Sequence, residues 1–259
     1  MIRKRGLIFA AVGASVLVIS GGAARAADGE IALFANGEDL ATDGFVGQKR
    51  TRDGWELRFD HIFVTVDALA AHQTEPPFDA GAGGAPAAVV TVEFDTGGPV
   101  TLDLAAAGDD GRLLVAEAAA PEGHYNALTW SVVPAPGGDW AGDWAENWAG
   151  QSMVFIGTAT KDGQTVPFTL TSDDTHAYAC GEYVGDERKG FVTAGGAADL
   201  EITFHLDHVF GRADKPADDP MNLQARGFDA FAGGGPQAIN LAGLHIGHVG
   251  EGHCAVSDR

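Results

Sequence analysis

Hydrophobic and polar residues alternate with a period of two along most of the chain. Ten runs show this alternation, at residues 30–35, 54–69, 87–96, 99–107, 111–119, 126–135, 152–160, 164–172, 176–184 and 198–210. Successive side chains of a strand point to opposite faces, so this period predicts strands that are buried on one face. Short strands at this spacing predict a mainly β fold, either an antiparallel β-sandwich or a barrel-like sheet.

Two regions between and after the runs define the expected organisation. The tetrapeptide Lys161–Gln164, "KDGQ", separates two alternating runs and predicts a tight hairpin. From about Asp219 the period of two is lost, and "DPMNLQARGFDAFAG" and "PQAINLAGLHIGHVG" predict short C-terminal helices. We therefore expect a β-sandwich domain at 27–218 and a helical, histidine-rich tail at 219–259 that packs on the same domain.

The first 26 residues form a segment of their own. A basic start (Arg3, Lys4, Arg5) precedes an apolar run, and small residues follow at Ala24 and Ala26. This order predicts a secretory signal peptide. No later run approaches the roughly 20 apolar residues of a membrane helix. We expect a soluble protein that is periplasmic or secreted, with no membrane insertion after cleavage of the signal.

Charge restricts the choice of partners. The chain has 16 Lys and Arg against 36 Asp and Glu, and four of the basic residues lie in the predicted signal, so the mature net charge is about −24. Such a charge repels nucleic acid and anionic lipid, which are poor partners. It attracts metal ions and cationic partners, and it also fits acidic side chains that simply keep an exported protein soluble.

The chain has two cysteines, Cys180 and Cys254. In an oxidising compartment the two predict a disulfide. The alternative is a free thiolate that acts as a soft metal ligand. If residues 176–180 form a strand, His176, Tyr178 and Cys180 share one face, and the disulfide holds the tail against it.

Enzyme signatures are absent from the sequence. It contains no G-x-S-x-G elbow, glycine-rich phosphate loop, C-x-x-C motif or D-x-D-x-D-G calcium loop. Catalysis by a covalent nucleophile is unsupported, and we expect no enzyme. A metal-dependent hydrolase remains a lesser alternative, because it requires only an open coordination position.

Nine histidines carry the clearest chemical signal. His245, His248 and His253 fall within nine residues, and in a helix the first two share a face. Three neutral imidazoles satisfy most of a zinc or copper site, so we predict these three as metal ligands. His176, His205 or His208 would complete the set. Such a tail could also be unstructured and bind nothing specifically.

The stretch 204–211, "FHLDHVFG", echoes "RFDHIFVT" at 58–65. In a regular strand, alternation sends His208 into the apolar stripe, as it does His61, and leaves His205 on the other face with Asp207. The histidines 205 and 208 meet on one metal only if the strand ends near Asp207. We expect Asp207 and Asp174 to orient ligating imidazoles.

Tryptophans provide an alternative function. Trp140, Trp144 and Trp148 are four residues apart, so a helix would stack them on one side. Buried, they would dock the helix onto the sandwich. Exposed, they would give an acidic, non-enzymatic module that binds a glycan or a protein.

The stretches "DGWELRFDHIFVTVDAL", "GTATKDGQTVPFTL", "HAYAC", "FHLDHVFG" and "GHVGEGHC" resemble those of exported bacterial proteins, periplasmic or lipid-anchored, whose activity is not established. The resemblance implies histidines that suit a transition metal. The lipid-attachment cysteine of the anchored members is missing here. We expect a transition-metal-binding protein, zinc first and copper second, for storage, delivery or sensing, with a metal transporter or receptor as its partner.

Overall fold

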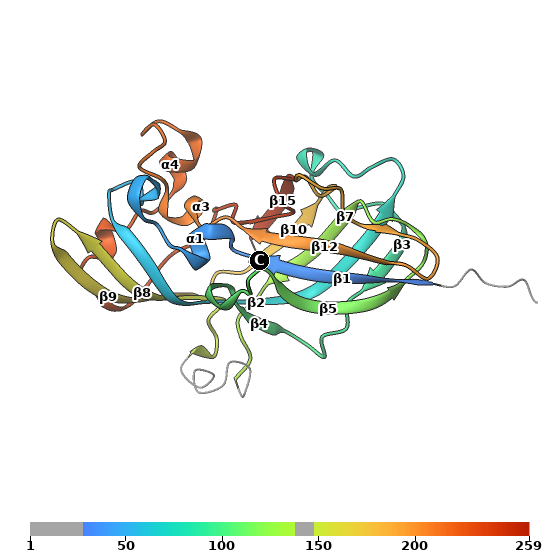
Figure 1. Cartoon of the computed structure of the whole chain (residues 1–259), viewed down its shortest axis with the longest axis horizontal. Helices are drawn as coiled ribbons and strands as arrows, with labels where there is room; N and C mark the ends of the chain where they lie inside the picture. The colour runs from blue at the N-terminus through green and yellow to red at the C-terminus, as the bar shows by residue number, and fades with distance from the viewer. Residues whose placement is uncertain (1–27, 138–147, 259) are drawn as a thin grey trace, which may run out of the picture.

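The computed structural model describes residues 28–137 and 148–258, which form a mainly β, sandwich-like fold (Figure 1). The smaller sheet has the strand order β14–β12–β1–β5. Its strands are β14 (Gly247–His248), β12 (Ala197–Phe204), β1 (Gly29–Asn36) and β5 (Leu113–Ala120). Strand β1 is parallel to β12, and the other two pairings are antiparallel. The predicted fold class is confirmed.

The larger sheet is organised around one long strand, β2 (Glu56–Thr74). Its order is β13–β9–β8–β2–β7–β10–β15, and β3 and β4 also pair with β2. The bounds are β3 (Ala88–Glu93), β4 (Val100–Asp103), β7 (Ala127–Val132), β8 (Met153–Lys161), β9 (Gln164–Ser172), β10 (His176–Cys180), β13 (Gly235–Ala238) and β15 (Cys254–Asp258). Bulges at Phe59/His61 and Asp67/Ala70 bend β2, so it can pair with different strands along its length.

The remaining elements are short. A two-stranded sheet pairs β6 (Gly123–His124) with β11 (Phe191–Val192). The described helices are α1 (Glu38–Thr42), α3 (Asp207–Phe210), α4 (Pro220–Gln224) and the single 3-10 turns η1 (Gly47–Lys49), η2 (Ala80–Ala82), η3 (Leu104–Ala106) and η5 (Asp229–Phe231). In Figure 1, α1 and α3 lie near each other beside the end of the smaller sheet.

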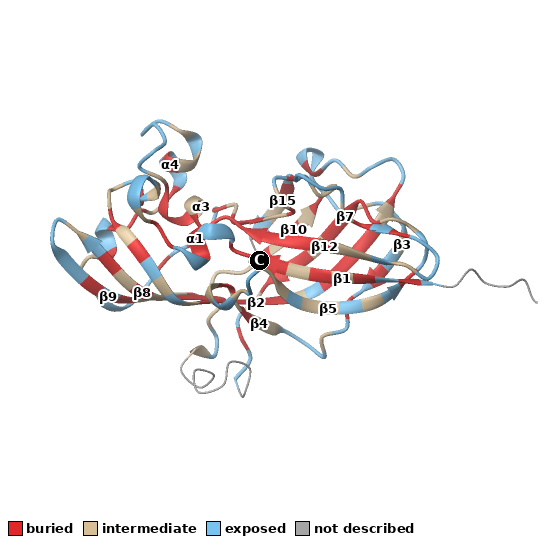
Figure 2. Cartoon of the chain, in the orientation of Figure 1, coloured by how far each residue is buried: buried red, intermediate tan, exposed pale blue. Residues whose placement is uncertain are grey.

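The core is formed by the inner faces of both sheets. Ile31 and Ile202 of the smaller sheet and Val64 and Trp130 of the larger one are almost fully buried and belong to one apolar cluster. Figure 2 shows this burial along β1, β12, β7 and β10. Each buried aliphatic or aromatic side chain contributes about 1.5–3 kcal/mol relative to exposure. Alternation of apolar residues along the strands therefore builds the core, as the sequence predicted.

Strands β8 and β9 are joined by a tight hairpin at the position that the sequence predicted. Strand β8 ends at Lys161 and β9 begins at Gln164, and the two residues between them have φ of 51° and 80°. Positive φ at both central positions is characteristic of a type I′ turn, whose twist matches a hairpin. The predicted hairpin at Lys161–Gln164 is confirmed.

The C-terminal tail agrees with the prediction in its first stretch, which holds the short helix α4 and the turn η5, and differs from it in the second. Within the described part of 219–259, α4 and η5 are the only helical elements, and residues 235–258 are turns and strands. Strands β13, β14 and β15 pair with β9, β12 and β10, respectively. Backbone groups that pair with distant strands need no helix, and local periodicity cannot reveal such partners. His245 and His248 therefore do not share a helix face.

A disulfide joins Cys180 to Cys254, as predicted. These residues are directly paired in the β10–β15 ladder, and both are buried. The side chains of His176, Tyr178 and Cys180 are all buried, so they do share one face of β10. The free-thiolate alternative is thereby excluded for both cysteines. The tail is held on the larger sheet by a covalent bond.

Candidate metal site

The histidines of 204–211 lie where β12 ends. The strand stops at Phe204, His205 N–H donates to the Ile246 carbonyl at 2.9 Å, and α3 begins two residues later. The prediction that strand alternation sends His208 into the apolar layer is therefore wrong, and the early strand end is what the chain adopts. The turn places the rings of His205 and His208 5.5 Å apart.

Five histidines form a continuous row of rings, which we call the histidine row: His205, His208, His245, His248 and His253. Ring centroids are 4.6 Å apart for 205 and 248, 5.2 Å for 208 and 248, 4.5 Å for 245 and 248, and 5.2 Å for 245 and 253. The row combines the end of β12, α3 and the tail. Five of the six predicted histidines are thus neighbours, although no helix aligns them.

The sixth predicted histidine lies one aromatic ring away from the row. His176 is 1% exposed and contacts Tyr178 at 6.1 Å between ring centroids. Tyr178 in turn faces His245 at 6.5 Å. Asp174, predicted to orient an imidazole, instead accepts hydrogen bonds from the Ser172 hydroxyl and the Leu241 N–H. Its carboxylate holds the backbone of the tail rather than a histidine.

A compact group of possible metal ligands lies at one end of the row. Glu38, His205 and Glu251 each offer a ligand atom, and these three atoms all lie within 4.8 Å of one another. We call this group the mouth triad. His205 is 8% exposed, whereas both carboxylates belong to exposed residues. The group therefore has a buried imidazole at its base and two carboxylates facing the surface.

The hydrogen bonds of His205 indicate which ring nitrogen is free for a cation. Its Nε2 lies 3.3 Å from the Gly250 carbonyl oxygen and donates to it, while Nδ1 lies 3.3 Å from Glu38 Oε2. With the proton of the neutral ring on Nε2, the Nδ1 lone pair faces the carboxylate, and a cation between the two would stabilise this arrangement. Two ligand atoms each about 2.0–2.1 Å from a tetrahedral zinc are about 3.4 Å apart.

A proton is the other cation that can stabilise this contact. Burial would lower the pKa of His205, but the hydrogen bond to Glu38 and the charge of that carboxylate outweigh it and raise the pKa. The site thus favours positive charge at Nδ1. A metal ion and a proton compete for the same lone pair.

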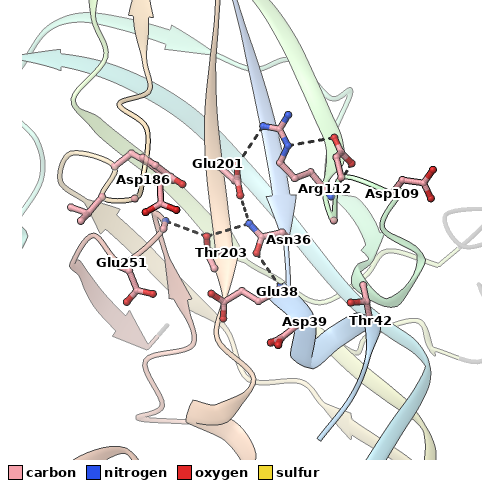
Figure 3. Close-up of a pocket in the computed structure, with 16 residues that line it drawn as sticks. Asn36, Glu38, Asp39, Thr42, Asp109, Arg112, Asp186, Glu201, Thr203 and Glu251 are labelled. Atoms are coloured by element: carbon pink, nitrogen blue, oxygen red, sulfur yellow. Dashed lines mark hydrogen bonds and ion pairs between the residues drawn. The ribbon is translucent and has the colours of Figure 1, made fainter. Parts of the chain in front are cut away.

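A buried hydrogen-bond hub positions the mouth triad (Figure 3). Asn36 Oδ1 accepts the Glu38 N–H at 3.1 Å, and its amide nitrogen donates to Glu201 and to Thr203 Oγ1. Thr203 Oγ1 also accepts the Gly250 N–H at 3.1 Å. The backbone of Glu38, that of Gly250 beside Glu251, and the strand that leads to His205 are therefore tied to one pair of side chains, Asn36 and Thr203.

Ion pairs extend this hub away from the mouth triad. Glu201 is 9% exposed and lies 3.3 Å from Lys189 Nζ and 3.5 Å from Arg112 Nη1. Both cations also contact Asp199, at 2.6 Å and 2.7 Å. Burial opposes ionisation of Asp199, but the hydrogen bonds from Lys189 and Arg112 lower its pKa overall. The carboxylates of the buried Glu201 and the half-buried Asp199 are therefore neutralised by their own partners and do not require a metal.

The inner histidines are neutral at neutral pH. Burial, reinforced by the neighbouring histidines, lowers the pKa of His245 to about 4 and that of His248 to about 3. Neutral imidazoles are the form that binds metals, because the ring keeps a lone pair on one nitrogen. His245 Nε2 is buried without a hydrogen-bond partner among the described residues.

Two cavities meet at the mouth triad. The first, which we call the histidine pocket, has a volume of about 470 Å³ and is lined by Glu38, His205, Asp207, His208, His248 and Glu251, among others. The second, the acidic cleft, has a volume of about 620 Å³ and includes Asp109, Asp110 and Asp186. Glu38 and Glu251 line both cavities. A cation that enters from the acidic cleft reaches the carboxylates before the histidines.

Sequence reasoning missed both carboxylates of the mouth triad. Glu38 and Glu251 are two of 36 acidic residues, and nothing in the local sequence of Glu38 distinguishes it. Glu251 carried a weak signal, since it lies between His248 and His253 in the segment already suspected of binding metal. Glu38 comes into contact with His205 only through the parallel pairing of β1 with β12.

Two predicted features lie partly or wholly outside the described residues. The predicted signal peptide, residues 1–26, lies wholly outside them. Of the three tryptophans in the predicted helix, Trp140 and Trp144 also lie outside. Trp148 is described and is partly buried. No helix in the described part of the chain is both long enough and apolar enough to cross a membrane.

Comparison of the chain with protein-family models, with curated proteins and with solved structures finds no match. The class of the protein is therefore defined by its own fold and site. It is a mainly β, disulfide-bonded protein with a candidate metal group of one histidine and two glutamates at the end of a row of histidines.

Proposed function

We propose that this protein binds a transition-metal ion at the mouth triad, zinc first and copper second, and acts in metal storage, delivery or sensing. The observation that carries the proposal is the 3.3 Å contact between His205 Nδ1 and Glu38 Oε2, with a Glu251 oxygen close enough to complete a three-ligand group. A cation bound between the imidazole and the two carboxylates would offset the negative charge that the group brings together.

The donor set favours zinc. Zinc accepts imidazole nitrogen and carboxylate oxygen in tetrahedral sites, and three protein ligands leave a fourth position for water or another side chain. Copper also accepts imidazole, so it ranks second. The paired cysteines contribute no thiolate, which removes the soft ligand that would favour Cu(I).

Two general properties support a role outside the cytoplasm. A disulfide between buried cysteines persists in an oxidising compartment, in agreement with the predicted signal peptide and a periplasmic or secreted location. The strongly acidic chain attracts metal cations to the acidic cleft. A metal transporter or receptor in that compartment would be its partner.

The test is equilibrium dialysis of the metal-free mature protein against zinc and copper, read by elemental analysis. We expect the wild type to bind zinc with a Kd below about 10 µM, equivalent to about 7 kcal/mol. The double variant Glu38→Gln/Glu251→Gln should bind at least about tenfold more weakly, because each amide removes a negative ligand at nearly constant volume.

A matched control is the double variant Glu117→Gln/Glu122→Gln, which changes net charge equally at two exposed positions that line neither cavity. It should leave zinc binding unchanged. Equal losses in the two double variants would mean that overall charge, and not the mouth triad, attracts the ion. Failure of the wild type to bind either metal below about 10 µM would refute the function.

A further inference from the structure

We propose that Tyr183 is a positioning residue of the metal site, whose aromatic ring fixes the backbone of Gly250 and, through it, two of the three ligands. This inference rests on the proposed function and deepens it, because it names a residue that sets metal affinity without being a ligand. Tyr183 lines the acidic cleft and packs against the apolar core. It lies outside the mouth triad itself.

The first step is the place of Gly250 between two ligands. Gly250 precedes Glu251 in the chain, and its carbonyl oxygen accepts the hydrogen bond from His205 Nε2 at 3.3 Å. Ligating histidines are typically oriented in this way, by a hydrogen bond from the second ring nitrogen. A shift of this one backbone unit therefore moves the Glu251 carboxylate and turns the His205 ring at the same time.

The second step is the contact between Gly250 and the aromatic ring. A Cβ at Gly250 would lie 2.8 Å from Tyr183 Cε2 and 3.0 Å from Tyr183 Cζ, so the ring packs directly against the backbone on that side. The Val184 carbonyl oxygen would lie 2.2 Å from the same Cβ. Among these three nearest atoms, the only side chain is that of Tyr183. Its ring therefore limits how far the turn can move toward it.

The third step is the pairing of the chain beside Tyr183 with the turn that carries Glu251. The Glu251 N–H donates to the Val184 carbonyl at 2.8 Å. On the other side of Glu251, a Cβ at Gly252 would lie 2.6 Å from the Glu182 carbonyl oxygen. The backbone on both sides of Tyr183 thus contacts the backbone on both sides of Glu251. The two segments are expected to move together.

The ring itself is fixed by the ion pairs of β12. Lys189 Nζ lies 5.3 Å from the centroid of the Tyr183 ring, within the range of a cation–π contact. The same ammonium group lies 2.6 Å from Asp199 and 3.3 Å from Glu201. A cation held by two carboxylates is a fixed support for the ring. Tyr183 therefore joins the ion pairs of the hub to the turn that presents Glu251.

Zinc affinity tests the inference. We expect Tyr183→Ala to bind zinc about 10- to 100-fold more weakly than the wild type in isothermal titration, as for other residues that orient metal ligands. Tyr183→Leu, which keeps apolar packing against the core but has no ring, should also bind more weakly. Tyr183→Phe should keep the wild-type Kd, because the ring remains. The control Phe191→Ala removes an aromatic ring that belongs to neither cavity, and it should keep the wild-type Kd as well.

The spectrum of a bound ion separates positioning from a general loss of stability. Electron paramagnetic resonance with one equivalent of Cu(II) should show a changed hyperfine coupling in Tyr183→Ala and Tyr183→Leu, because the carboxylate of Glu251 no longer reaches the ion. Tyr183→Phe and Phe191→Ala should give the wild-type spectrum. A wild-type spectrum in Tyr183→Ala and Tyr183→Leu would mean that the ring only stabilises the fold, and would overturn the inference.

The outcomes also distinguish this inference from the function on which it rests. If the wild type binds zinc and both Tyr183→Ala and Tyr183→Leu bind it equally well, the inference is wrong and the proposed function stands. If Tyr183→Phe loses as much affinity as Tyr183→Ala, the hydroxyl and not the ring is responsible, and the inference is again wrong. A wild type that binds neither zinc nor copper refutes both.

Discussion

At the scale of single residues, the candidate site depends on unusual backbone conformations beside its carboxylates. Glu38 has φ of 54°, a left-handed value that is uncommon for a residue with a side chain. Gly250, next to Glu251, has φ of 58°, and a Cβ there would lie 2.2 Å from the Val184 carbonyl oxygen. Strained conformations of this kind concentrate at functional sites. The strain at Glu38 is offset by the hydrogen bond from its N–H to Asn36.

The first prediction concerns Gly250→Ala. The new methyl group cannot fit against Val184, so the turn that presents Glu251 should shift, with a loss of about 2–3 kcal/mol in free energy of unfolding and weaker zinc binding. The control is Gly243→Ala, which has φ of 74° and open space around its Cβ. It should lose about 1 kcal/mol and keep zinc binding. Urea unfolding measures the stability of each variant, and dialysis measures its zinc binding. Equal effects of the two substitutions would contradict a special role for the turn at Gly250.

At the scale of elements, the central interaction is the parallel pair β1 and β12. The pairing aligns Asn36 with Thr203, and both side chains are buried. From these two strand ends, one chain segment leads to Glu38 and the other to His205. Sequence patterns predicted each strand, but the parallel pairing joins residues 167 positions apart, which no local pattern encodes.

The second prediction concerns Thr203→Val. Loss of the hydroxyl leaves the Gly250 N–H without its acceptor, which should cost about 1–3 kcal/mol in stability. Zinc affinity should fall about 10- to 100-fold, as for other residues that orient metal ligands.

The control is Thr65→Val, which removes an equally buried hydroxyl that is hydrogen-bonded to Thr101 at 2.7 Å in the larger sheet. It should lose stability without a change in zinc Kd. If isothermal titration finds the same Kd in Thr203→Val as in the wild type, the hub does not position the mouth triad.

The run 198–210 shows how an element can end inside a convincing pattern. Its apolar alternation continues to Phe210, yet β12 stops at Phe204 and α3 follows. The apolar residues Leu206, Val209 and Phe210 are fully buried although they follow the strand, so their hydrophobicity does not by itself distinguish a strand from a turn and helix here. The hydrogen bond from His205 to Ile246, in the distant tail, decides it.

At the scale of the whole molecule, buried histidines link folding to pH. His72 is 9% exposed and its two ring nitrogens contact the hydroxyls of Thr91 and Thr129 at 3.0 and 2.9 Å. Burial lowers its pKa below 6.5. The folded state therefore disfavours the protonated ring. This contribution to stability is present above the unfolded pKa of about 6.5 and is lost as pH falls below it.

The third prediction follows from the lowered pKa of His72, which makes the folded state less stable as pH falls. Between about pH 7 and pH 5 the metal-free wild type should lose more free energy of unfolding than His72→Gln, whose side chain does not titrate. His245 and His248 also have lowered pKa values, but they are present in both proteins and cancel in the comparison. Urea titrations at each pH give the free energy of unfolding, and its slope against pH is compared between the wild type and His72→Gln. Parallel slopes would show that His72 does not contribute to the acid sensitivity.

The sequence by itself determined most of the strands, the hairpin at Lys161–Gln164, the disulfide and a set of histidines that are candidate metal ligands. These features depend on local periodicity, on the φ values of a short turn, or on the pairing of only two cysteines. Tertiary structure alone decided that β12 ends before His205, that the tail forms strands, and that Glu38 and Glu251 meet His205. The physical reason is that these outcomes rest on hydrogen bonds and contacts between residues far apart in the chain, whose free energies no short segment contains.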